Sequence, residues 1–85
     1  MQVRVRLFAI HRERVGNHQL FVHLVDQATV ADLVAQLTQQ YPELAALSSA
    51  ARYAVNREYA PTTRILQDGD EVALIPPVAG GENPC

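Results

Sequence analysis

Hydrophobic and polar residues alternate along the first part of the chain. In the opening segment MQVRVRLFAI, Val3, Val5 and Leu7 occupy every second position, with polar residues between them. This period of two indicates a β-strand with one buried face. The segment HQLFVHLV alternates in the same way after Gly16 and Asn17. We therefore predict an N-terminal hairpin, although the connection HRERVG is longer than a tight two-residue turn.

The pattern then changes to a helical period. Thr29 is a suitable N-cap, Asp32 lies three residues further on as in a capping box, and Pro42 ends the segment. Between these signals, four apolar residues fall at i, i+3, i+4 and i+7 on one helix face, namely Val30, Leu33, Val34 and Leu37. One amphipathic helix is predicted here, and the following segment PELAALSS could hold a further short helical turn.

The last third of the chain returns to strand patterns. The segment RYAVN is typical of a third strand and EVALIPP of a final strand that the prolines stop, with QDGD as the turn before it. The order β-β-α-β-β predicts an α+β fold of the β-grasp (ubiquitin-like) type. Such a fold has a mixed sheet of four or five strands covered by one main helix. A split βαβ layout has a similar number of elements and stays open on the pattern alone.

Composition narrows the class of protein. With 48% hydrophobic and 19% charged residues, the 85 residues are expected to fold as one soluble domain. The net charge is −2, and all seven positive residues are Arg, without the basic patch that nucleic-acid binding needs. No apolar run is long enough to span a membrane, and no leader precedes the first strand. We therefore expect a cytoplasmic protein that binds neither nucleic acid nor membrane.

Three segments resemble one protein family. LFAIHRERVG, AVN and above all DGDEVALIPPVAGG are similar to the small, sulfur-carrying subunit of molybdopterin synthase, a ubiquitin-like β-grasp protein. The resemblance covers residues 1–81, and its specific part is a DGD turn, a strand, a proline pair and Gly-Gly in this order. The sulfur carrier of the thiamine pathway shares the fold and the Gly-Gly end. The thiamine-pathway carrier is usually shorter and lacks the segment PPVAGG before its end, so we rank it second.

The resemblance implies a mechanism for the end of the chain. In the family, an activating enzyme uses ATP to adenylate the carboxylate of the terminal glycine, which corresponds to Gly81 after Gly80. Sulfur then replaces the adenylate to give a thiocarboxylate. The tail is inserted into the large subunit of the synthase, where the sulfur passes to a pterin precursor. The carrier is thus expected to be a non-catalytic subunit of a sulfurtransferase complex, with no bound cofactor and no metal.

The residue types suit this role. Residues 1–77 are predicted to form the β-grasp domain and residues 78–85 a flexible tail. The Gly80–Gly81 pair has no Cβ atoms, so it can pass through a narrow channel and expose an unhindered carbonyl carbon. The Pro76–Pro77 pair would hold the start of the tail extended, which lets a few residues reach a buried site.

A docking surface is predicted beside the tail. Phe8 and Ile75 alternate away from the buried face of their strands, and large apolar side chains in such places indicate that a partner covers them. The resemblance places Tyr59 in the same region. Packing of these side chains under a loop is the alternative. The predicted partner-binding set also includes four residues before the glycine pair, namely Pro76, Pro77, Val78 and Ala79.

The extension ENPC departs from the family pattern. A carboxylate cannot be activated at Gly81 while Glu82 is attached. We favour removal of residues 82–85 by a processing protease. A remnant or artefact of the sequence ranks second, and a retained tail on a chain that is not a working carrier ranks third. Cys85 could hold a persulfide, but no basic residue lies within the last twenty residues, which favours an unreactive thiol.

Other candidate sites have simpler interpretations. Three histidines are interpreted as surface residues rather than metal ligands, namely His11, His18 and His23. Three acidic residues are interpreted as a solvated turn, namely Asp68, Asp70 and Glu71. Arg4 and Arg6 share the face opposite the core, and they either guide an acidic partner or are simply exposed to solvent. Arg12 and Glu13 form the RE element of the family-like segment, where a bond that closes the loop and a partner contact stay open.

Two further function classes stay open. The chain could be a protein modifier joined through Gly81 to amines on target proteins, or an interaction module that regulates a partner without carboxyl chemistry. No Ser-His-Asp or Cys-His arrangement and no Gly-rich nucleotide loop before a helix is recognisable. An independent enzyme is therefore not expected.

Overall fold

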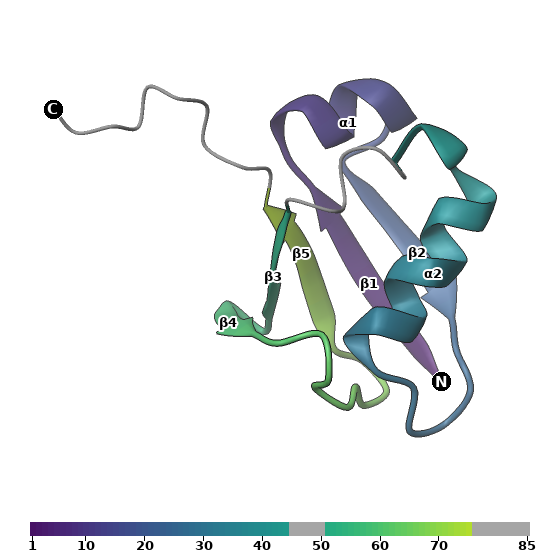
Figure 1. Ribbon diagram of the computed structural model, residues 1–85, viewed down its shortest axis with the longest axis vertical. Coiled ribbons are helices and arrows are strands. Elements are labelled where there is room, and N and C mark those ends of the chain that lie inside the picture. The colour runs from purple at the N-terminus through teal and green to yellow at the C-terminus, as the bar shows by residue number, and fades with distance from the viewer. Residues whose placement is uncertain (45–50, 76–85) are drawn as a thin grey trace, which may run out of the picture.

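A mixed sheet of five strands is the frame of the computed structural model, which describes residues 1–44 and 51–75 (Figure 1). The strands are Gln2–Leu7 (β1), Gln19–His23 (β2), Arg52–Val55 (β3), Glu58–Ala60 (β4) and Glu71–Ile75 (β5). The described helices are Ala9–Val15 (α1), Val30–Gln40 (α2) and the 3-10 helix Pro42–Leu44 (η1). The predicted strands and the main helix are all present, and the structure adds α1 and β4.

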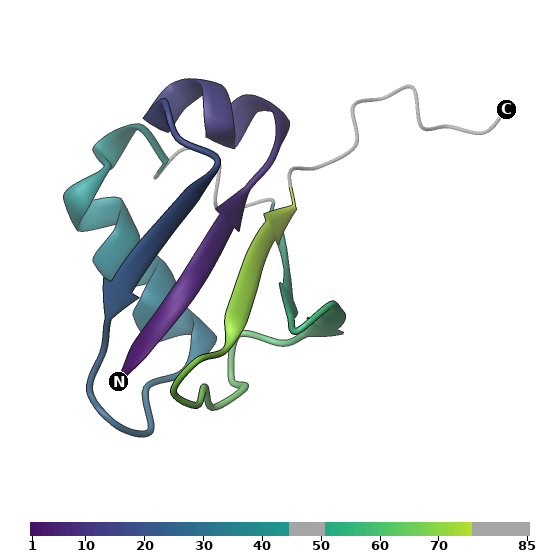
Figure 2. The ribbon, with the colours of Figure 1, turned by 180° about the vertical axis from the view of Figure 1, so that it is seen from behind.

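The strands lie in the order β2-β1-β5-β3-β4. The central pair β1 and β5 is parallel, and the other neighbouring pairs are antiparallel. The main helix α2 lies across one face of this sheet (Figure 1). Seen from behind, the opposite face is not crossed by any helix of the described residues (Figure 2). This is the β-grasp arrangement, so the predicted fold class is confirmed and the split βαβ layout is not adopted.

Strand alternation decides which face of the sheet receives α2. Val3 and Val5 of β1 are fully buried, as are Val72 and Leu74 of β5. The buried residues of α2 pack in the same core, and they are Val30, Leu33 and Leu37. Burial of one such aliphatic side chain stabilises the fold by about 1.5–3 kcal/mol. A slip of one residue in either central strand would therefore expose its whole buried row.

The predicted start of the main helix is confirmed. Thr29 is the N-cap of α2, and its Oγ1 accepts a hydrogen bond from the Asp32 backbone N–H at 3.3 Å. The Asp32 carboxylate in return accepts the Thr29 backbone N–H at 2.9 Å. These reciprocal bonds form a capping box, which satisfies two backbone donors at the helix start. The predicted apolar stripe is also correct, with Val34 half-buried at its edge.

The predicted hairpin connection between the first two strands is wrong. β1 and β2 do pair antiparallel, but the short helix α1 joins them instead of a turn. Gly16 ends this helix with a φ of +88°, and its N–H donates to the Arg12 carbonyl at 2.8 Å. A left-handed residue after the last turn is a common helix end, and glycine adopts it without strain. The helix has only 7 residues, too few for a clear apolar period.

The interpretation of His11 as a surface residue is wrong. His11 lies on α1 and is fully buried, with neither ring nitrogen hydrogen-bonded within the described residues. Burial lowers the pKa of His11 from its ordinary value of 6.5, because the charged ring would lose its hydration. The Leu74 backbone opposes this shift in part, although it makes no hydrogen bond of good geometry with the ring. The neutral imidazole therefore serves as a packing group between α1 and the core.

The strand β4 was not predicted. It pairs antiparallel with β3 through a two-residue turn, in which Asn56 has a φ of +51° and Arg57 a φ of +73°. Two consecutive residues with positive φ are the geometry of a type I′ hairpin turn, for which Asn-Gly is the usual sequence. Arg57 occupies the position that usually holds glycine, so the sequence lacks the common signal for this hairpin.

The predicted QDGD turn is confirmed. Gly69 has a φ of +86°, and the carboxylates of Asp68 and Asp70 accept backbone N–H groups from Gln2 and Gln67, both at 2.8 Å. β5 follows directly and leads to Ile75. Residues 45–50, with the rest of the segment PELAALSS, lie outside the described residues, as do residues 76–85. The predicted domain limit at residue 77 therefore stays a prediction. Over residues 1–44 and 51–75, the helices are too short or too polar to cross a membrane.

Candidate functional site: the outer face of the sheet

The sheet face turned away from α2 is the candidate site, and we call it the outer face. Strand register places every second residue of each strand on it, opposite the buried rows. Its members are Gln19, Phe21 and His23 of β2, Gln2, Arg4 and Arg6 of β1, Glu71, Ala73 and Ile75 of β5, Arg52 and Ala54 of β3, and Tyr59 of β4. No described helix covers these residues (Figure 2).

Large apolar side chains gather near the end of the outer face where β5 ends. Phe8 follows β1 with an extended backbone, so its side chain continues the alternation, and it is 40% exposed. Tyr59 is 71% exposed on the edge strand, and Ile75 is half-buried at the end of β5. The structure thus places the three predicted docking residues on one surface. Their contact with a partner stays a prediction.

Small residues form the floor between these large ones. Ala54 of β3 lies directly beside Ala73 of β5 and also beside Tyr59 of β4. Ala54 is only 7% exposed although it is on the uncovered face. An open groove of about 390 Å³ runs along Arg52, Tyr59 and Ala60 at this edge. This groove follows the β3–β4 edge rather than the alanine floor, and an open groove of this kind suits a protein surface better than a small molecule, whose sites are concave and enclosing.

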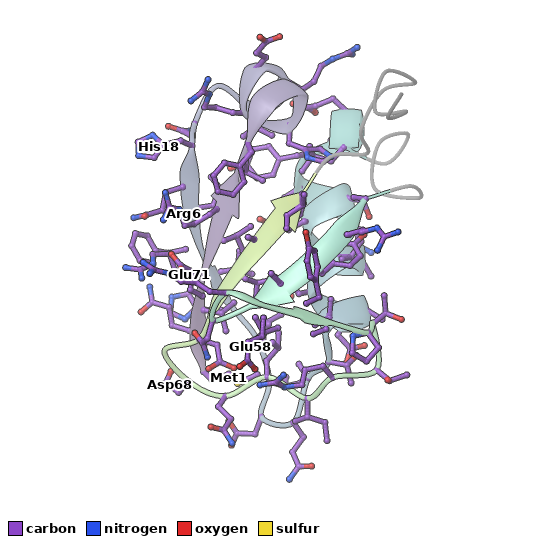
Figure 3. All side chains as sticks on the ribbon, turned by 90° about the vertical axis from the view of Figure 1, so that its left-hand side faces the viewer. Met1, Arg6, His18, Glu58, Asp68 and Glu71 are labelled. Atoms are coloured by element: carbon purple, nitrogen blue, oxygen red, sulfur yellow. The ribbon has the colours of Figure 1, made fainter. Side chains whose placement is uncertain are left out.

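An arginine pair shares one carboxylate in the middle of the face. Oε2 of Glu71 lies 3.4 Å from Nη2 of Arg4 and 3.5 Å from Nη1 of Arg6. Arg6 and Glu71 point to the side of the sheet away from α2 (Figure 3). The guanidinium carbon of Arg6 also lies 5.5 Å from the centre of the Phe8 ring. Arg6 therefore connects the charged part of the outer face to its apolar end through a cation–π contact.

The acidic turn has a structural role in addition to its contact with water. Asp68 and Asp70 accept the backbone hydrogen bonds described above, whereas Glu71 is the counter-ion of the arginine pair. His18 and His23 are exposed, as predicted. Within residues 1–44 and 51–75, no three His, Cys, Asp or Glu residues come together as a metal site would require.

Arg12 and Glu13 lie exposed on α1. No ion pair of the described residues includes either of them. The two interpretations of this element, a bond that closes the loop and a partner contact, therefore both stay open.

The predicted reactive end lies outside the described residues. This holds for the glycines Gly80 and Gly81, for the tail docking residues Pro76, Pro77, Val78 and Ala79, and for the extension from Glu82 to Cys85. The structure does describe where the tail begins. Ile75 pairs with Arg52 on β3, and its β1 side is next to Phe8, because Leu7 pairs with Leu74 one step earlier. The described part of the chain therefore ends at Ile75, beside the apolar end of the outer face.

Sequence reasoning missed several members of this surface, among them Arg52, Ala54 and Ala73. Their alternation within RYAVN and EVALI was visible, but their value depends on β3 lying next to β5. Neighbours in a sheet are set by tertiary pairing, and these two strands are separated by residues 56–70 in the sequence. A predicted β3–β5 pair would have brought the two alanines together.

Comparison with known proteins agrees with the fold and with the family resemblance. The model of the ThiS family matches residues 5–81. The molybdopterin synthase sulfur carrier subunit of Chlamydomonas reinhardtii is 40% identical over 83 residues, which cover 95% of this chain and 100% of that protein. The crystal structure of SAMP1 from Haloferax volcanii has a TM-score of 0.86 at 29% identity and covers 95% of this chain and 100% of its own.

A second solved structure is a protein-protein complex of subunits 1 and 2 of the molybdopterin-converting factor from Helicobacter pylori 26695. Its matching chain has a TM-score of 0.69 at 27% identity and covers 95% of this chain and 100% of that chain. The likeness thus extends from fold to sequence over nearly the full length. The chain belongs to the ThiS family and is a relative of the sulfur carrier subunits of molybdopterin synthase, which confirms the predicted family.

Proposed function

We propose that this chain is the sulfur carrier of a molybdopterin synthase and acts in molybdenum cofactor biosynthesis through a thiocarboxylate at Gly81. The proposal depends on one observation, the 40% identity with the C. reinhardtii sulfur carrier subunit over 95% of this chain and all of that one. The Gly80–Gly81 pair supplies the slender end group that such a role requires. Because Glu82 follows, the proposal includes removal of residues 82–85 by a protease, and it places the chain in the cytoplasm with its partners.

The chemistry needs no catalytic side chain from the carrier. A carboxylate is a poor electrophile, so it must first acquire a leaving group. Attack of the Gly81 carboxylate on the α-phosphate of ATP, bound by an activating enzyme, releases pyrophosphate and gives an acyl-adenylate. A sulfur nucleophile at the oxidation level of sulfide then displaces AMP and leaves the thiocarboxylate. The thiocarboxylate sulfur would then displace an oxygen leaving group from a carbon of the pterin precursor to form a thioester, and water would hydrolyse this thioester, which leaves the sulfur on the pterin and restores the Gly81 carboxylate.

The outer face supports a carrier that meets large partners. Phe8, Ile75 and Tyr59 surround the place where the tail begins, so a protein bound there would hold the tail at its own active site. The Helicobacter pylori complex of subunits 1 and 2 is a precedent for such a partner in a protein of this fold. The large subunit of the synthase and the activating enzyme would use this face in turn.

Truncated chains test the proposal directly. A chain that ends at Gly81 should support ATP–pyrophosphate exchange with the cognate activating enzyme, and the full 85-residue chain should not. A chain that ends at Gly80 is the matched control, since its shorter tail should not deliver the carboxylate. The intact mass of the protein from its own cells should show the loss of residues 82–85 and one oxygen exchanged for sulfur. Pterin sulfuration by a chain that retains those residues would contradict the proposal.

A protein modifier is the second candidate function. The likeness to SAMP1, a small archaeal modifier protein, at a TM-score of 0.86 favours it. A modifier would leave a ladder of conjugates in a cell lysate probed for this chain, joined through Gly81. A free or thiocarboxylate terminus and no ladder would favour the carrier.

A carrier of the thiamine pathway would restore growth of a thiamine auxotroph rather than the activity of molybdenum enzymes. An interaction module would keep its activity when Gly80 and Gly81 are replaced. These two outcomes separate the remaining alternatives from the proposed carrier.

A further inference from the structure

The outer face has a charge opposite to that of the rest of the chain. Its charged side chains are those of Arg4, Arg6, Arg52 and Glu71. Three arginines and one carboxylate give a formal charge of +2. The whole chain has a net charge of −2, so all other residues together amount to −4. Positive charge is therefore concentrated on the one sheet face that the described helices leave uncovered (Figure 2).

The positive charge is only partly neutralised within the face. One oxygen of Glu71 serves both Arg4 and Arg6, at 3.4 and 3.5 Å, and this carboxylate is 14% exposed. Both arginines keep 40% or more of their side chains accessible. Arg52 is exposed and takes part in no ion pair of the described residues. A partner that covers this face would thus meet at least two guanidinium groups without a full counter-charge.

The arginines lie on both sides of the apolar end. Arg6 contacts the Phe8 ring on the β1 side, and Arg52 is the direct neighbour of Ile75 on the β3 side. Tyr59, Ala54 and Ala73 lie side by side on neighbouring strands, one outer-face position before Ile75 along β5. An apolar partner surface without carboxylates would bury Arg52 unpaired and would leave Arg6 with only a share of the Glu71 carboxylate, which is unfavourable. The same surface with carboxylates at its rim would satisfy them.

From this arrangement we propose that the outer face recognises a protein surface with an apolar centre for Phe8 and Tyr59 and carboxylates opposite Arg6 and Arg52. The inference rests on the proposed function, in which the large subunit of molybdopterin synthase is that partner. Complementary charge mainly raises the association rate and rejects wrong partners, whereas the apolar contacts govern dissociation. The arginines are therefore specificity determinants of docking and take no part in the sulfur chemistry.

Charge reversal at Arg52 tests the inference. The chain that ends at Gly81, as the proposed function requires, and its Arg52→Glu variant are mixed with the cognate large subunit, and the association rate is measured by stopped-flow at low and high ionic strength. We expect Arg52→Glu to slow association by roughly tenfold at low salt and to reduce the salt dependence. Arg64→Glu is the matched control. Arg64 is exposed in the loop before β5, and its own backbone carbonyl accepts the N–H of Val30 at the start of α2, the helix on the other face of the sheet. Arg64→Glu changes the net charge equally and should alter the rate by less than about twofold.

The outcomes separate this inference from the proposed function. If the wild-type chain does not bind the large subunit, the proposed function fails and the inference fails with it. If the wild type binds but Arg52→Glu and Arg64→Glu behave alike, only the inference is overturned. Two other results would also overturn the inference. One is a salt-sensitive dimer of the chain alone that Arg52→Glu abolishes, and the other is salt-sensitive binding of a nucleic-acid duplex that Arg52→Glu abolishes. Urea unfolding of each variant verifies the fold. If Arg52→Glu does not fold, Arg52→Gln replaces it in the experiment and should give an intermediate association rate.

Discussion

Asn56 and Glu71 hold each other across the sheet through two hydrogen bonds. The Asn56 backbone N–H donates to the Glu71 carbonyl at 2.8 Å, and the Glu71 N–H donates to the Asn56 side-chain oxygen at 3.0 Å. Nδ2 of Asn56 also donates to Oδ1 of Asp70 at 3.0 Å. One asparagine thus fixes the β3–β4 turn to the start of β5, the strand that leads to the tail. The position of Tyr59 relative to Ile75 depends on this connection.

Replacement of Asn56 by Ala should lower the free energy of unfolding by about 1–2 kcal/mol. The variant loses two side-chain hydrogen bonds and places alanine, which tolerates the left-handed region less well than asparagine, at a φ of +51°. Urea denaturation measures the change. Asn56→Gly restores the backbone freedom without the side chain, so it should lose less, and Asn17→Ala at an exposed position is the control. Equal stabilities of all three variants would contradict the role of Asn56.

Loss of the α2 cap should also destabilise the fold. Thr29→Ala removes the oxygen that accepts the Asp32 N–H, and we expect a loss of about 1 kcal/mol in the free energy of unfolding. Thr29→Ser keeps the cap oxygen and should retain nearly the full stability. Thermal unfolding followed by far-UV circular dichroism compares the two. A Thr29→Ser variant as unstable as Thr29→Ala would indicate that the methyl group, not the capping bond, is what matters.

The stability of the protein should fall in mild acid because of His11. Its pKa is lowered in the folded state, so the unfolded chain, with the ordinary value of 6.5, binds a proton at higher pH than the folded chain does. The stability is therefore complete above about pH 6.5 and decreases as the pH drops below this value towards the folded pKa. One proton accounts for a slope of at most about 1.4 kcal/mol per pH unit.

Urea unfolding between neutral pH and pH 5 checks this dependence. His11→Leu, which keeps an uncharged group of similar size in the core, should lose this part of the slope. His18→Gln at an exposed position should retain it. A slope that is unchanged in His11→Leu would show that other groups cause the acid sensitivity.

The two phenylalanines of the outer face offer a matched pair for docking. Phe8 lies at the tail end of the face, whereas Phe21 is paired with Arg4 further along and is 60% exposed. We expect Phe8→Ala to weaken binding to the large subunit by roughly tenfold or more, as for an aromatic residue near the centre of an interface. Phe21→Ala should change the affinity by less than about threefold, as expected at an interface rim. Titration calorimetry measures both, and a larger loss in Phe21→Ala would move the docking centre away from the tail.

Much of the fold could be predicted because local signals and the final structure agree. The alternation of Val3, Val5 and Leu7 and the capping pair Thr29 and Asp32 each depend on residues close in the sequence. The helix α1 and the strand β4 could not be predicted in this way. α1 has only 7 residues, and the β4 turn has Arg57 where glycine would have signalled a hairpin. Short elements of this kind are stabilised by packing rather than by their own propensity.

The sequence by itself determined the strand faces, the main helix, the DGD turn and a tail with two glycines. These features follow from periodicity and backbone preference, which act over a few residues. Only the tertiary structure decided that His11 is buried and that Arg6 and Arg52 lie on either side of the apolar end of the outer face. Those relations require β5 to lie between β1 and β3, a pairing of distant segments that depends on the packing of the whole core.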